Sequence, residues 1–465
     1  MQPAHKRSTN RSRRQFLGRA AGLAAGALGW AQFVPARALG RGTTPPSERI
    51  GVALIGCGGR GIGEAQSSLA QSDKCQILAV CDPWDSKTAR ARETFQRLAA
   101  ERLGKQNVKG CDCYRDFRDV LARPDIDAVY IATSDHWHVP ITIAAARAGK
   151  DMHTEKPLGI SIEHDLAARQ AVRRYDRVFQ YGTERRSTPT ARHAIELVLN
   201  GRIGKVQALY VNSPGSIQGG SPTPVLPVPQ EFDYDLWLGP APEAPYCRDR
   251  CLTPDGIYHL YDYAIGFIAG WAAHPLDMLQ WWADQLGLGI PVTYEGRGRL
   301  PESGLYDTVL EWDMLCRYEN GLTLRFMDNQ TSGRSDIPGM RGPNAATFVG
   351  TEGWISVSYD QIQASQPSLL RSVVSPNEIR LPRSSEAGTP YVEAHHLSWL
   401  DCVRTRQDPV SNIDSAVRSD LISHLCDIAV RRGRPIRWDQ VRETIVDDEM
   451  ARRMMSRPMR GPWQL

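Results

Sequence analysis

Short apolar runs alternate with longer amphipathic stretches over residues 49–181 of the chain. The runs at 50–55 and 128–132 are apolar almost throughout and end at glycine or polar residues, which predicts buried strands. The stretch 83–102 begins with proline and is rich in Ala, Arg and Glu, so it predicts a helix. Strands that alternate with helices form right-handed βαβ units around a parallel sheet. The same pattern predicts further strands at 75–80, 151–155 and 178–181, and further helices at 116–122, 140–148 and 161–175.

After about residue 203 the pattern changes to strand-like runs with few helices between them. Residues 213–230 are rich in Pro and Gly and predict a loop. Such segregated strands and helices are typical of an α+β domain. We therefore expect an α/β chain in which a parallel-sheet domain precedes an α+β domain with an open, mostly antiparallel sheet. The predicted strands are 205–211, 305–318, 322–326 and 354–359, and the predicted helices are the later part of 261–282 and 418–431.

Composition and charge are those of an ordinary globular protein, apart from the first residues. The 465 residues are 41% hydrophobic and 23% charged, which excludes a chain disordered throughout, a collagen and a multi-span membrane protein. The net charge of +4 is misleading, because residues 1–38 contain seven Lys or Arg and no acid, which leaves the remainder at −3. The charge therefore does not support a basic surface for binding nucleic acid, and we expect no nucleic-acid partner.

The first 38 residues have the pattern of an export signal. Arg13-Arg14-Gln15-Phe16-Leu17 resembles a twin-arginine signal, an Ala-, Gly- and Leu-rich run follows over 20–34, and Ala36-Arg37-Ala38 fits small-x-small cleavage. A membrane anchor is the alternative interpretation, but the run has only about 15 residues and a span needs about 20 apolar ones. We expect a twin-arginine signal peptide at 1–38, a linker at 39–48, and a periplasmic or secreted protein without stable membrane insertion.

A glycine-rich turn with the residue order of a dinucleotide-binding loop follows the first predicted strand. In Gly56-Cys57-Gly58-Gly59-Arg60-Gly61 the first glycine permits the turn, the second lets the backbone approach a pyrophosphate, and the third lets helix and strand pack closely. Asp82 ends the second predicted strand, where a carboxylate accepts hydrogen bonds from ribose hydroxyls and repels a 2′-phosphate. NAD is therefore favoured, and NADP remains the alternative because Arg60 offers a phosphate contact. The expected cofactor contacts here are Gly56, Gly58, Gly59, Arg60, Gly61 and Asp82.

Three polar segments, 133–138, 155–157 and 181–186, follow other predicted strands at the carboxyl edge of the sheet. Open α/β sheets bind ligands at this edge. Lys156, desolvated beside a nicotinamide, would exchange a proton with a substrate hydroxyl; the alternative is a surface lysine before a proline turn. His136 and His138 are metal ligands by residue type, but their place after a strand favours contacts with the cofactor, and we expect no metal site.

Ten cysteines are scattered along the chain rather than spaced as a disulfide framework. Cys57 and Cys81 fall on or beside predicted buried strands and are expected to be packed thiols. Cys247 and Cys251, in a predicted loop, are the best candidates for a disulfide. Cys111-Asp112-Cys113 has no second Cys pair at zinc spacing, so no structural metal is expected there.

Five motifs together resemble the glucose–fructose oxidoreductase, inositol dehydrogenase and MocA (Gfo/Idh/MocA) family. They are the glycine turn, 133–138, Glu155-Lys156-Pro157, 201–206 and Trp237-Leu238-Gly239-Pro240, and the Glu-Lys-Pro tripeptide is the most specific of them. The resemblance implies a Rossmann domain that binds NAD(P), a second α/β domain whose open sheet often forms the oligomer interface, and oxidation or reduction of sugars and cyclic polyols. We place the Rossmann domain at 49–180, the substrate and oligomerisation domain at 181–440, and a C-terminal extension at 441–465.

The resemblance also assigns roles to individual residues. Lys156 matches the family's catalytic lysine and His274 its histidine, but Gly270 stands where the family has an aspartate four residues earlier. This departure puts the usual lysine–aspartate–histidine relay in doubt. Asp277, one turn after His274, either orients the imidazole or pairs on the helix face. The matched cofactor contacts are Gly59, Arg60, Asp82, Asp135, His136, Trp137, His138, Glu155, Lys156 and Glu184, and the expected substrate-pocket residues are Arg185, Tyr258, Tyr261 and Trp271.

Export narrows the expected chemistry, because we expect no free nicotinamide pool outside the cytoplasm and a bound cofactor must then be regenerated in each cycle. The first hypothesis is an oxidoreductase with tightly bound NAD(P) that transfers hydride at a ring CH–OH of a small carbohydrate or polyol. The second is a redox-neutral glycosidase that oxidises a glycoside, eliminates the aglycone, adds water and reduces the ring again.

Other functions fit the sequence less well. A glycosidase with two catalytic carboxylates is a poor match, since no motif places such a pair. A binding protein that kept the fold and lost activity is a third hypothesis, which Gly270 makes conceivable. For the assembly we expect a homodimer or homotetramer, because a broad open sheet is usually covered.

Overall fold

The computed structural model describes residues 48–104, 110–220, 224–251, 256–337, 339, 344–359, 361–384 and 388–465. The predicted signal peptide, and the linker up to residue 47, lie outside the described residues. Internal contacts group residues 50–465 into one unit.

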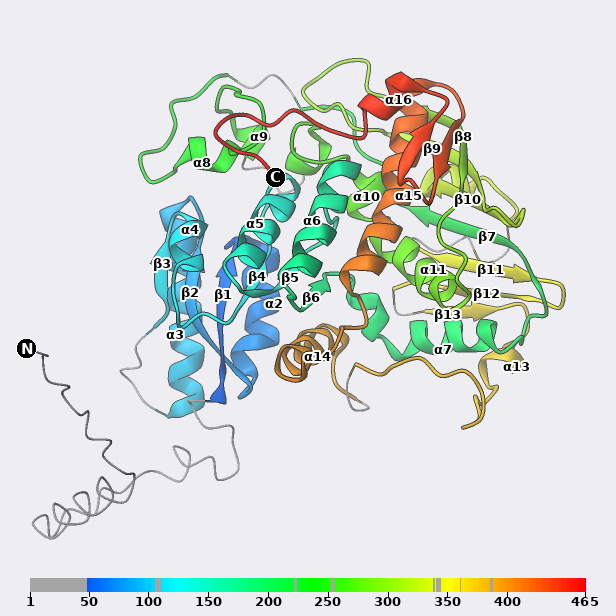
Figure 1. The fold of residues 1–465 in the computed structure, drawn as a ribbon, viewed down its shortest axis with the longest axis horizontal. Helices are drawn as coiled ribbons and strands as arrows, with labels where there is room; N and C mark the ends of the chain where they lie inside the picture. Colours follow the sequence, from blue (N-terminus) through cyan, green and yellow to red (C-terminus); the bar gives the residue numbers. More distant parts are fainter. Residues whose placement is uncertain are drawn as a thin grey trace, which may run out of the picture. The chain divides into compact units, whose positions relative to one another are not determined.

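Six parallel strands form the first sheet, in the order β3-β2-β1-β4-β5-β6 (Figure 1). Alternate residues of β1 face opposite sides, so that Ala53 and Ile55 join one hydrophobic core while Val52 and Leu54 join another. Burial on both faces explains why this strand is a continuous apolar run. The strands are β1 (Ile50–Ile55), β2 (Cys75–Cys81), β3 (Asp112–Tyr114), β4 (Ala128–Ile131), β5 (Asp151–Thr154) and β6 (Phe179–Tyr181).

Helices cover both faces of this sheet. The helices α4, α5 and α6 form one group, and α2 and α3 form the other together with α14, which arrives from far along the chain. Trp399 and Leu400 of α14 are buried in the core on the α2 side. The helices are α2 (Gly59–Ser67), α3 (Asp85–Leu103), α4 (Phe117–Leu121), α5 (Asp135–Arg147), α6 (Ile162–Arg174) and α14 (Tyr391–Thr405), with the 3-10 turn η2 (Leu69–Gln71).

Nine strands form the second sheet, in the order β13-β12-β11-β7-β10-β9-β8-β14-β15. The pair β7–β10 is parallel and every other neighbouring pair is antiparallel. The strands are β7 (Val206–Ser213), β8 (Thr293–Arg299), β9 (Glu311–Arg317), β10 (Thr323–Asp328), β11 (Ala346–Gly350), β12 (Trp354–Val357), β13 (Ile362–Ala364), β14 (Ile436–Asp439) and β15 (Thr444–Val446).

The helix α15 (Ile413–Arg432) joins the two sheets. It packs against α11 and β8 of the second domain, and also against α6 and β6 of the first (Figure 1). The remaining helices are α7 (Pro189–Leu199), α8 (Tyr234–Leu238), α9 (Arg248–Cys251), α10 (Phe267–Gly270), α11 (Ala273–Gln285), α12 (Asn329–Gly333), α13 (Pro367–Leu370) and α16 (Glu449–Arg453), with the 3-10 turns η3 (Glu184–Ser187) and η4 (Gly256–His259).

The predicted fold class is confirmed: a parallel sheet with helices on both faces precedes a domain with a mixed, mostly antiparallel sheet. One correction concerns the helix predicted over 140–148, which begins earlier and includes most of the polar segment 133–138. Helix α5 begins at Asp135, with Ser134 in the N-cap position and the Asp135 carboxylate in the first turn, where the helix dipole favours an acid.

Several elements were not predicted, chiefly short strands of the second sheet and the helices α7 and α14. Strand β8 contains two glycines, and these separate the charged residues at positions 295, 297 and 299. Its local sequence is therefore typical of a loop. Its pairing with β9 over seven residues and the packing of α15 against it make it a strand. Tertiary contacts have overridden local propensity here.

The last 25 residues, expected as an extension, are part of the folded unit. Strand β15 pairs with β14 at the edge of the nine-stranded sheet. Trp463 then packs edge-on against Trp137 of α5, with ring centroids 4.7 Å apart. The C-terminal segment therefore contacts both domains.

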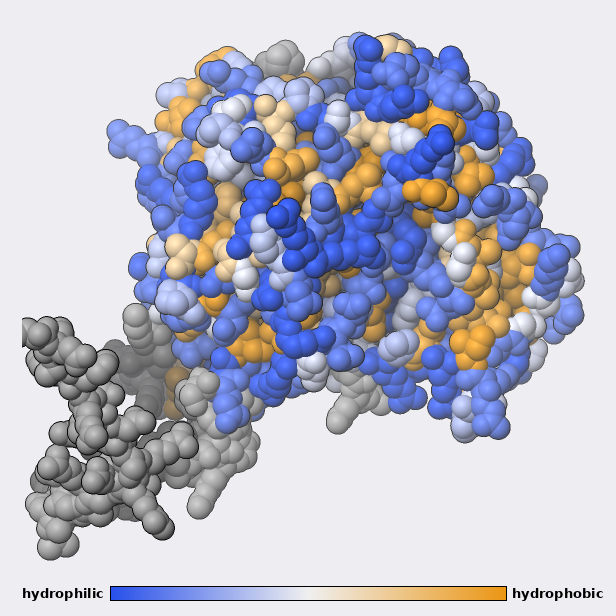
Figure 2. Space-filling view, in the orientation of Figure 1, coloured by the Kyte–Doolittle hydropathy of each residue, from blue (hydrophilic) through white to orange (hydrophobic). Residues whose placement is uncertain are grey.

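Polar side chains dominate the face of the molecule drawn in Figure 2, and apolar ones lie in patches between them. The most exposed large apolar residues, Val225, Val373 and Val441, come from three separate segments. Among the described helices, none has the length and apolar character that a membrane crossing requires.

Candidate active site

The glycine turn connects β1 to α2, and its four glycines fall into two pairs. Gly56 has a φ of +99°, and a Cβ there would lie 2.3 Å from the Ala132 carbonyl oxygen. A Cβ on Gly61 would lie 2.4 Å from the Gly56 carbonyl oxygen. A Cβ on Gly58 or Gly59 would meet nothing within 4 Å. Two glycines thus permit the turn, and two leave open space in front of the N-terminus of α2.

That open space is a cavity of about 740 Å³ along the carboxyl edge of the first sheet. Its volume is in the range of cofactor and ligand pockets. Asp82 lines it and uses its carboxylate to accept hydrogen bonds from the backbone N–H groups of Cys57 (2.9 Å) and Trp84 (3.0 Å). Burial raises the pKa of Asp82, and Lys87, which also lines the cavity, acts against this rise. The turn, the cavity and this carboxylate fit the adenosine half of a dinucleotide.

A second pocket, of about 200 Å³, adjoins the first and shares Arg60, Ala132, Thr133 and Tyr258 with it. Lys156 and His274 both line this smaller pocket. They come from the loop after β5 and from the first turn of α11. The structure therefore brings the two predicted reacting residues together where the cofactor cavity ends. The other residues lining it are Asp135, His138, Glu155, Phe267, Gly270, Trp271 and Tyr359.

Lys156 is held by a backbone carbonyl. Its Nζ donates to the carbonyl oxygen of Gly270 at 2.6 Å and lies 5.3 Å from the centre of the Trp271 ring. Burial and the positive charge of Arg60 lower the pKa of Lys156, while Glu155 and Glu184 oppose that shift. Gly270 stands at the position of the motif's aspartate, so its carbonyl supplies the partner that a carboxylate would otherwise provide.

His274 is buried and neutral. Burial holds the pKa of its imidazole well below the ordinary value, although the nearby Glu184 acts in the opposite direction. Its Nδ1 lies 3.8 Å from Glu184 Oε2 and has no hydrogen-bond partner among the described residues. A neutral imidazole with a free nitrogen can accept a proton.

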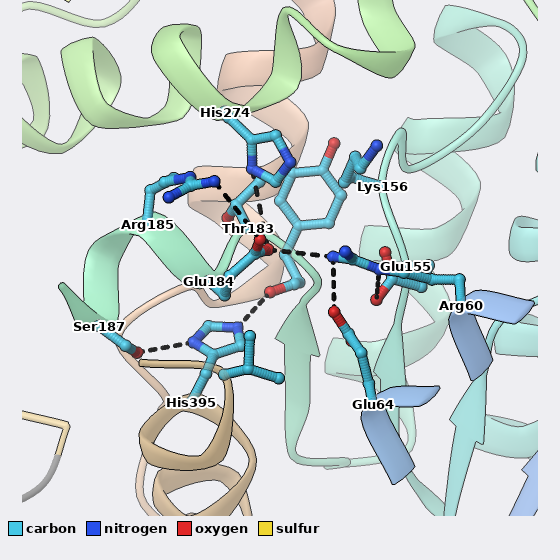
Figure 3. A network of polar contacts seen from close by, with 12 residues as sticks. Arg60, Glu64, Glu155, Lys156, Thr183, Glu184, Arg185, Ser187, His274 and His395 are labelled. Carbon is cyan, nitrogen blue, oxygen red and sulfur yellow. Dashed lines mark hydrogen bonds and ion pairs between the residues drawn. The ribbon is translucent and has the colours of Figure 1, made fainter. Parts of the chain in front are cut away.

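Arg60 lines both pockets, and its guanidinium is paired with acidic side chains. Figure 3 shows its guanidinium between three acidic side chains, with nitrogen–oxygen distances of 2.8 Å to Glu64, 3.3 Å to Glu184 and 3.5 Å to Glu155. Burial acts to raise the pKa of Glu184, but the positive charges of Arg60 and Arg185 act against it, and the net effect is a lowered pKa. The predicted cofactor contacts Glu155 and Glu184 are therefore ionised partners of Arg60 at one end of the crevice.

Glu64, which the sequence did not single out, holds a proton. The Tyr130 hydroxyl lies 2.8 Å from Glu64 Oε2 and 3.0 Å from Glu155 Oε1. A phenol has one proton to donate, so one of these carboxyl groups must itself be protonated and donate to the phenolic oxygen. Burial and the charge of Glu155 raise the pKa of Glu64 to about 9, which identifies Glu64 as the protonated one. No local motif marks Glu64 or Tyr130.

The segment 135–138 divides between the two pockets and the core. Trp137 lines the cofactor cavity, and Asp135 and His138 line the smaller pocket. His138 Nδ1 lies 2.7 Å from the Pro157 carbonyl oxygen, which ties α5 to the loop that carries Lys156. Burial raises the pKa of Asp135 to about 8. His136 is the exception, because its Nε2 contacts the Trp237 carbonyl oxygen and its ring lies outside both pockets.

Asp277 neither orients the imidazole nor pairs along its own helix, so both alternatives for this residue are wrong. Its carboxylate accepts from Arg186 Nε and from Thr183 Oγ1, each at 2.7 Å, and is fully buried. This ion pair fastens α11 to η3, behind the pocket rather than inside it.

Two of the four predicted substrate-pocket residues line the smaller pocket, namely Tyr258 and Trp271. Tyr261 is elsewhere: its hydroxyl donates to Asp427 at 3.1 Å, and Arg431 and Arg457 stack on its ring. Arg185 is buried behind the pocket wall, where it donates to the Tyr359 carbonyl oxygen at 2.9 Å. Tyr359, which follows β12 and carries no sequence signal, takes the place expected of Arg185.

The predicted disulfide between Cys247 and Cys251 is not formed, because all ten cysteines are free thiols. Cys57 and Cys81 are buried, as predicted. Cys251 lines the cofactor cavity.

Comparison with known proteins agrees with this geometry. Residues 50–183 match the family model described as "Oxidoreductase family, NAD-binding Rossmann fold", and residues 216–465 match "Oxidoreductase family, C-terminal alpha/beta domain". In solved structures, the aldose-aldose oxidoreductase from Caulobacter crescentus complexed with glycerol shares the fold, with a TM-score of 0.54 and 18% identity over 84% of this chain and 99% of that chain.

Curated relatives match over shorter stretches. The scyllo-inositol 2-dehydrogenase (NAD(+)) of Bacillus subtilis is 30% identical over 157 residues, 34% of this chain and 42% of the relative. The glycosyl hydrolase family 109 protein 2 of Shewanella sp. is 34% identical over 119 residues, 26% of this chain and 25% of the relative. The chain thus spans less than half the length of either relative. Because the two family models together match most of its residues, the chain belongs to the Gfo/Idh/MocA oxidoreductase family, with an NAD-binding Rossmann domain at its N-terminal side.

Proposed function

We propose that this chain oxidises or reduces a ring CH–OH of a sugar or cyclic polyol with a tightly bound NAD(P) cofactor. The observation that carries the proposal is the joining of two pockets: the cavity of the glycine turn leads directly into the pocket of Lys156 and His274. When bound, the nicotinamide supplies a hydride acceptor or donor. A relative named as an NAD-dependent inositol dehydrogenase supports the substrate class.

Within this proposal the two reacting side chains divide the work. His274 lines the pocket and is neutral because it is buried, and it takes the proton of the substrate hydroxyl. The Lys156 ammonium group stabilises the developing negative charge on the substrate oxygen. Tyr258, Phe267, Trp271 and Tyr359 give the pocket aromatic walls, which suit the C–H faces of one sugar or polyol ring.

The adenosine end of the crevice supports NAD, with NADP as the alternative. Asp82 places a carboxylate in the cavity, where it would repel a 2′-phosphate. Lys87, Arg90 and Arg115 line the same cavity and would attract one. Comparison of NAD and NADP binding to the purified protein separates the two.

A redox-neutral glycosidase is the second candidate, favoured by the relatives named as glycosyl hydrolase family 109 proteins. In that cycle a hydride leaves C3 for the cofactor and the C3 hydroxyl proton goes to a base, which acidifies the C2–H. Loss of the C2 proton would then expel the aglycone from C1, and the aglycone would leave with a proton. Water would add at C1 as a proton returns to C2, and the hydride would return from a bound cofactor to C3 as the C3 oxygen regains its proton from the base. The net reaction is hydrolysis, and the cofactor ends as it began.

We further propose that the protein acts outside the cytoplasm and as a homodimer or homotetramer. The twin-arginine pattern at 13–17 supports export of a protein already folded around its cofactor. The breadth of the nine-stranded sheet supports an assembly, because open sheet surfaces are usually covered. Fractionation of cells that express the full chain tests export, and native mass spectrometry of the mature chain tests subunit number and retained nucleotide together.

Two assays on the purified mature chain decide between dehydrogenase and glycosidase. In the first, a panel of aldoses and cyclic polyols is mixed with the protein, and absorbance of the reduced nicotinamide is followed in a single turnover. In the second, an aryl glycoside is incubated in deuterated water. Cofactor reduction without aglycone release supports the dehydrogenase, whereas aglycone release with deuterium at C2 supports the glycosidase. A protein that retains no nucleotide and reduces none under either condition contradicts both.

A further inference from the structure

Two aspartates and a histidine meet where α6 packs against α15, apart from both pockets. His424 Nε2 lies 3.3 Å from Asp165 Oδ2 and 3.7 Å from Asp420 Oδ2. One ligand-type atom from each residue lies within 4.8 Å of the others, and all three side chains are buried, Asp165 and Asp420 completely. None of the three lines the cofactor cavity or the reacting pocket.

Three polar atoms of this cluster, from Asp165 and His424, lack a hydrogen-bond partner within the described part of the chain. Both carboxylate oxygens of Asp165 and the Nε2 of His424 are buried without a hydrogen bond. A buried, ionised carboxylate with no partner costs several kcal/mol, so such groups normally have a compensating charge. The nearby Arg169 is paired with Glu443 instead.

The Nε2 atom of His424 is the ring nitrogen nearest to the two carboxylates. It is buried and has no hydrogen-bond partner within the described part of the chain. A neutral imidazole offers the lone pair of such a nitrogen to a metal ion.

The spacing suits a small divalent cation. In a tetrahedral zinc site the metal–ligand distances of about 2.0–2.2 Å put neighbouring ligand atoms about 3.3–3.6 Å apart. The separation of 3.3 Å between His424 and Asp165 falls in this range, and that of 3.7 Å between His424 and Asp420 lies just above it. Two carboxylates and one neutral imidazole also balance a charge of +2.

We propose that Asp165, Asp420 and His424 bind a divalent cation, with zinc as the best match. The ion would be structural, since all its ligands are buried. Asp420 Oδ2 accepts from Leu158 N at 3.0 Å, and Asp420 Oδ1 accepts from the Tyr181 hydroxyl at 3.1 Å. The ion therefore joins α6 and α15 and fixes, through Asp420, the loop that follows Lys156.

Metal content of the untagged mature chain tests the proposal. The protein is made in zinc-supplemented medium, passed over a chelating resin and analysed by inductively coupled plasma mass spectrometry for zinc, manganese, iron and magnesium. We expect about one zinc per chain, and less than about a tenth of that in Asp165→Asn and His424→Gln. Asp427→Asn is the matched control. It removes a buried carboxylate that lies on α15, like His424, but outside the cluster, so this variant should keep the metal.

If the variants do not fold, metal removal from the wild-type chain tests the proposal instead. Removal of the ion with a strong chelator should lower Tm, and zinc alone should restore it. Cobalt in place of zinc should give the visible absorption of a tetrahedral site. One equivalent of another divalent metal that Asp165→Asn loses also supports the site. Substoichiometric metal with no response of Tm to zinc, or full occupancy in Asp165→Asn, overturns the proposal and leaves a cluster that shares protons.

Discussion

The two ends of the crevice are built in opposite ways. The cofactor end is an open cavity of about 740 Å³, and the part of it that would face the pyrophosphate is shaped by backbone: a glycine turn, a helix N-terminus and a strand end, all within residues 50–82. The reacting end is a pocket of about 200 Å³ shaped by side chains from distant segments, and its lysine bonds a carbonyl 114 positions away. Backbone shape there depends on local sequence, whereas the reacting end depends on how the two domains meet.

The ends also differ in electrostatics. Basic side chains line the cofactor end together with the single carboxylate of Asp82. The reacting end adjoins Arg60 and its three buried acids, one of which is protonated. A change at the cofactor end should therefore alter binding, and one at the reacting end should alter chemistry and its dependence on pH.

The largest effect is expected from Lys156→Met. Loss of the ammonium group should slow reduction of bound cofactor by substrate about 10²–10⁴-fold while the nucleotide stays bound. Stopped-flow absorbance measures the rate, and native mass spectrometry the occupancy. Lys150→Met is the matched control at the other end of β5, where Nζ donates to the Arg123 and Ile126 carbonyl oxygens at 2.7 Å and 2.8 Å. It should leave the rate within about twofold and lower only stability. An unchanged rate in Lys156→Met would remove Lys156 from the chemistry.

The cofactor end is tested by a pair of neighbouring glycines in α2. In Gly61→Ala the new Cβ lies 2.4 Å from a backbone oxygen, so the turn must shift, and we expect affinity for NAD to fall at least about tenfold. Gly63→Ala meets nothing within 4 Å and should instead stabilise the helix by up to about 1 kcal/mol with no loss of affinity. Isothermal titration calorimetry on nucleotide-free protein gives the affinities. Equal affinities in the two variants would contradict the assignment of the turn.

The proton on Glu64 makes the free energy of unfolding depend on pH, and Glu64→Gln should remove this contribution. The pKa of Glu64 is raised to about 9 in the folded protein by burial and by Glu155, while the unfolded chain ionises near pH 4.3. Between these values the folded state holds a proton that the unfolded state has released, so the free energy of unfolding falls as pH rises, by at most about 1.4 kcal/mol per pH unit.

Urea unfolding at about pH 5, 7 and 9 measures this slope. It should be shallower in Glu64→Gln and unchanged in the control Glu163→Gln, which alters an exposed glutamate on α6. If wild type and Glu64→Gln lose stability in parallel, the proton does not reside on Glu64.

The smallest effect is expected from Gly270→Asp, which places an aspartate where the family motif has one. A Cβ at this position meets only Phe267 Cδ1, at 3.9 Å, so the side chain has room. A carboxylate near the Lys156 ammonium group should raise the pKa of Lys156. In the pH profile of kcat/KM, the basic limb should then move to a pH higher by about 0.5–1 unit. Gly270→Ala adds bulk without charge and should leave the limb in place. A limb that does not move in Gly270→Asp would show that Lys156 does not control it.

The local sequence was sufficient for much of this site. The apolar run of β1, the glycine turn after it and Asp82 after β2 follow one another along the chain, and their geometry depends on backbone conformation that nearby residues impose. Lys156 and His274 were identified through family motifs, and the structure places both in one pocket.

The directions of charged side chains required the tertiary structure. Arg60 pairs with three acids, Asp277 pairs with Arg186 instead of His274, and Tyr261 bonds Asp427 away from the pocket. Apart from Glu64, which lies one turn from Arg60 on α2, each of these partners lies on another element, so no local pattern specifies it. The same holds for the proton on Glu64 and for the meeting of Asp165 with His424, because burial and long-range packing set the charge that each group carries.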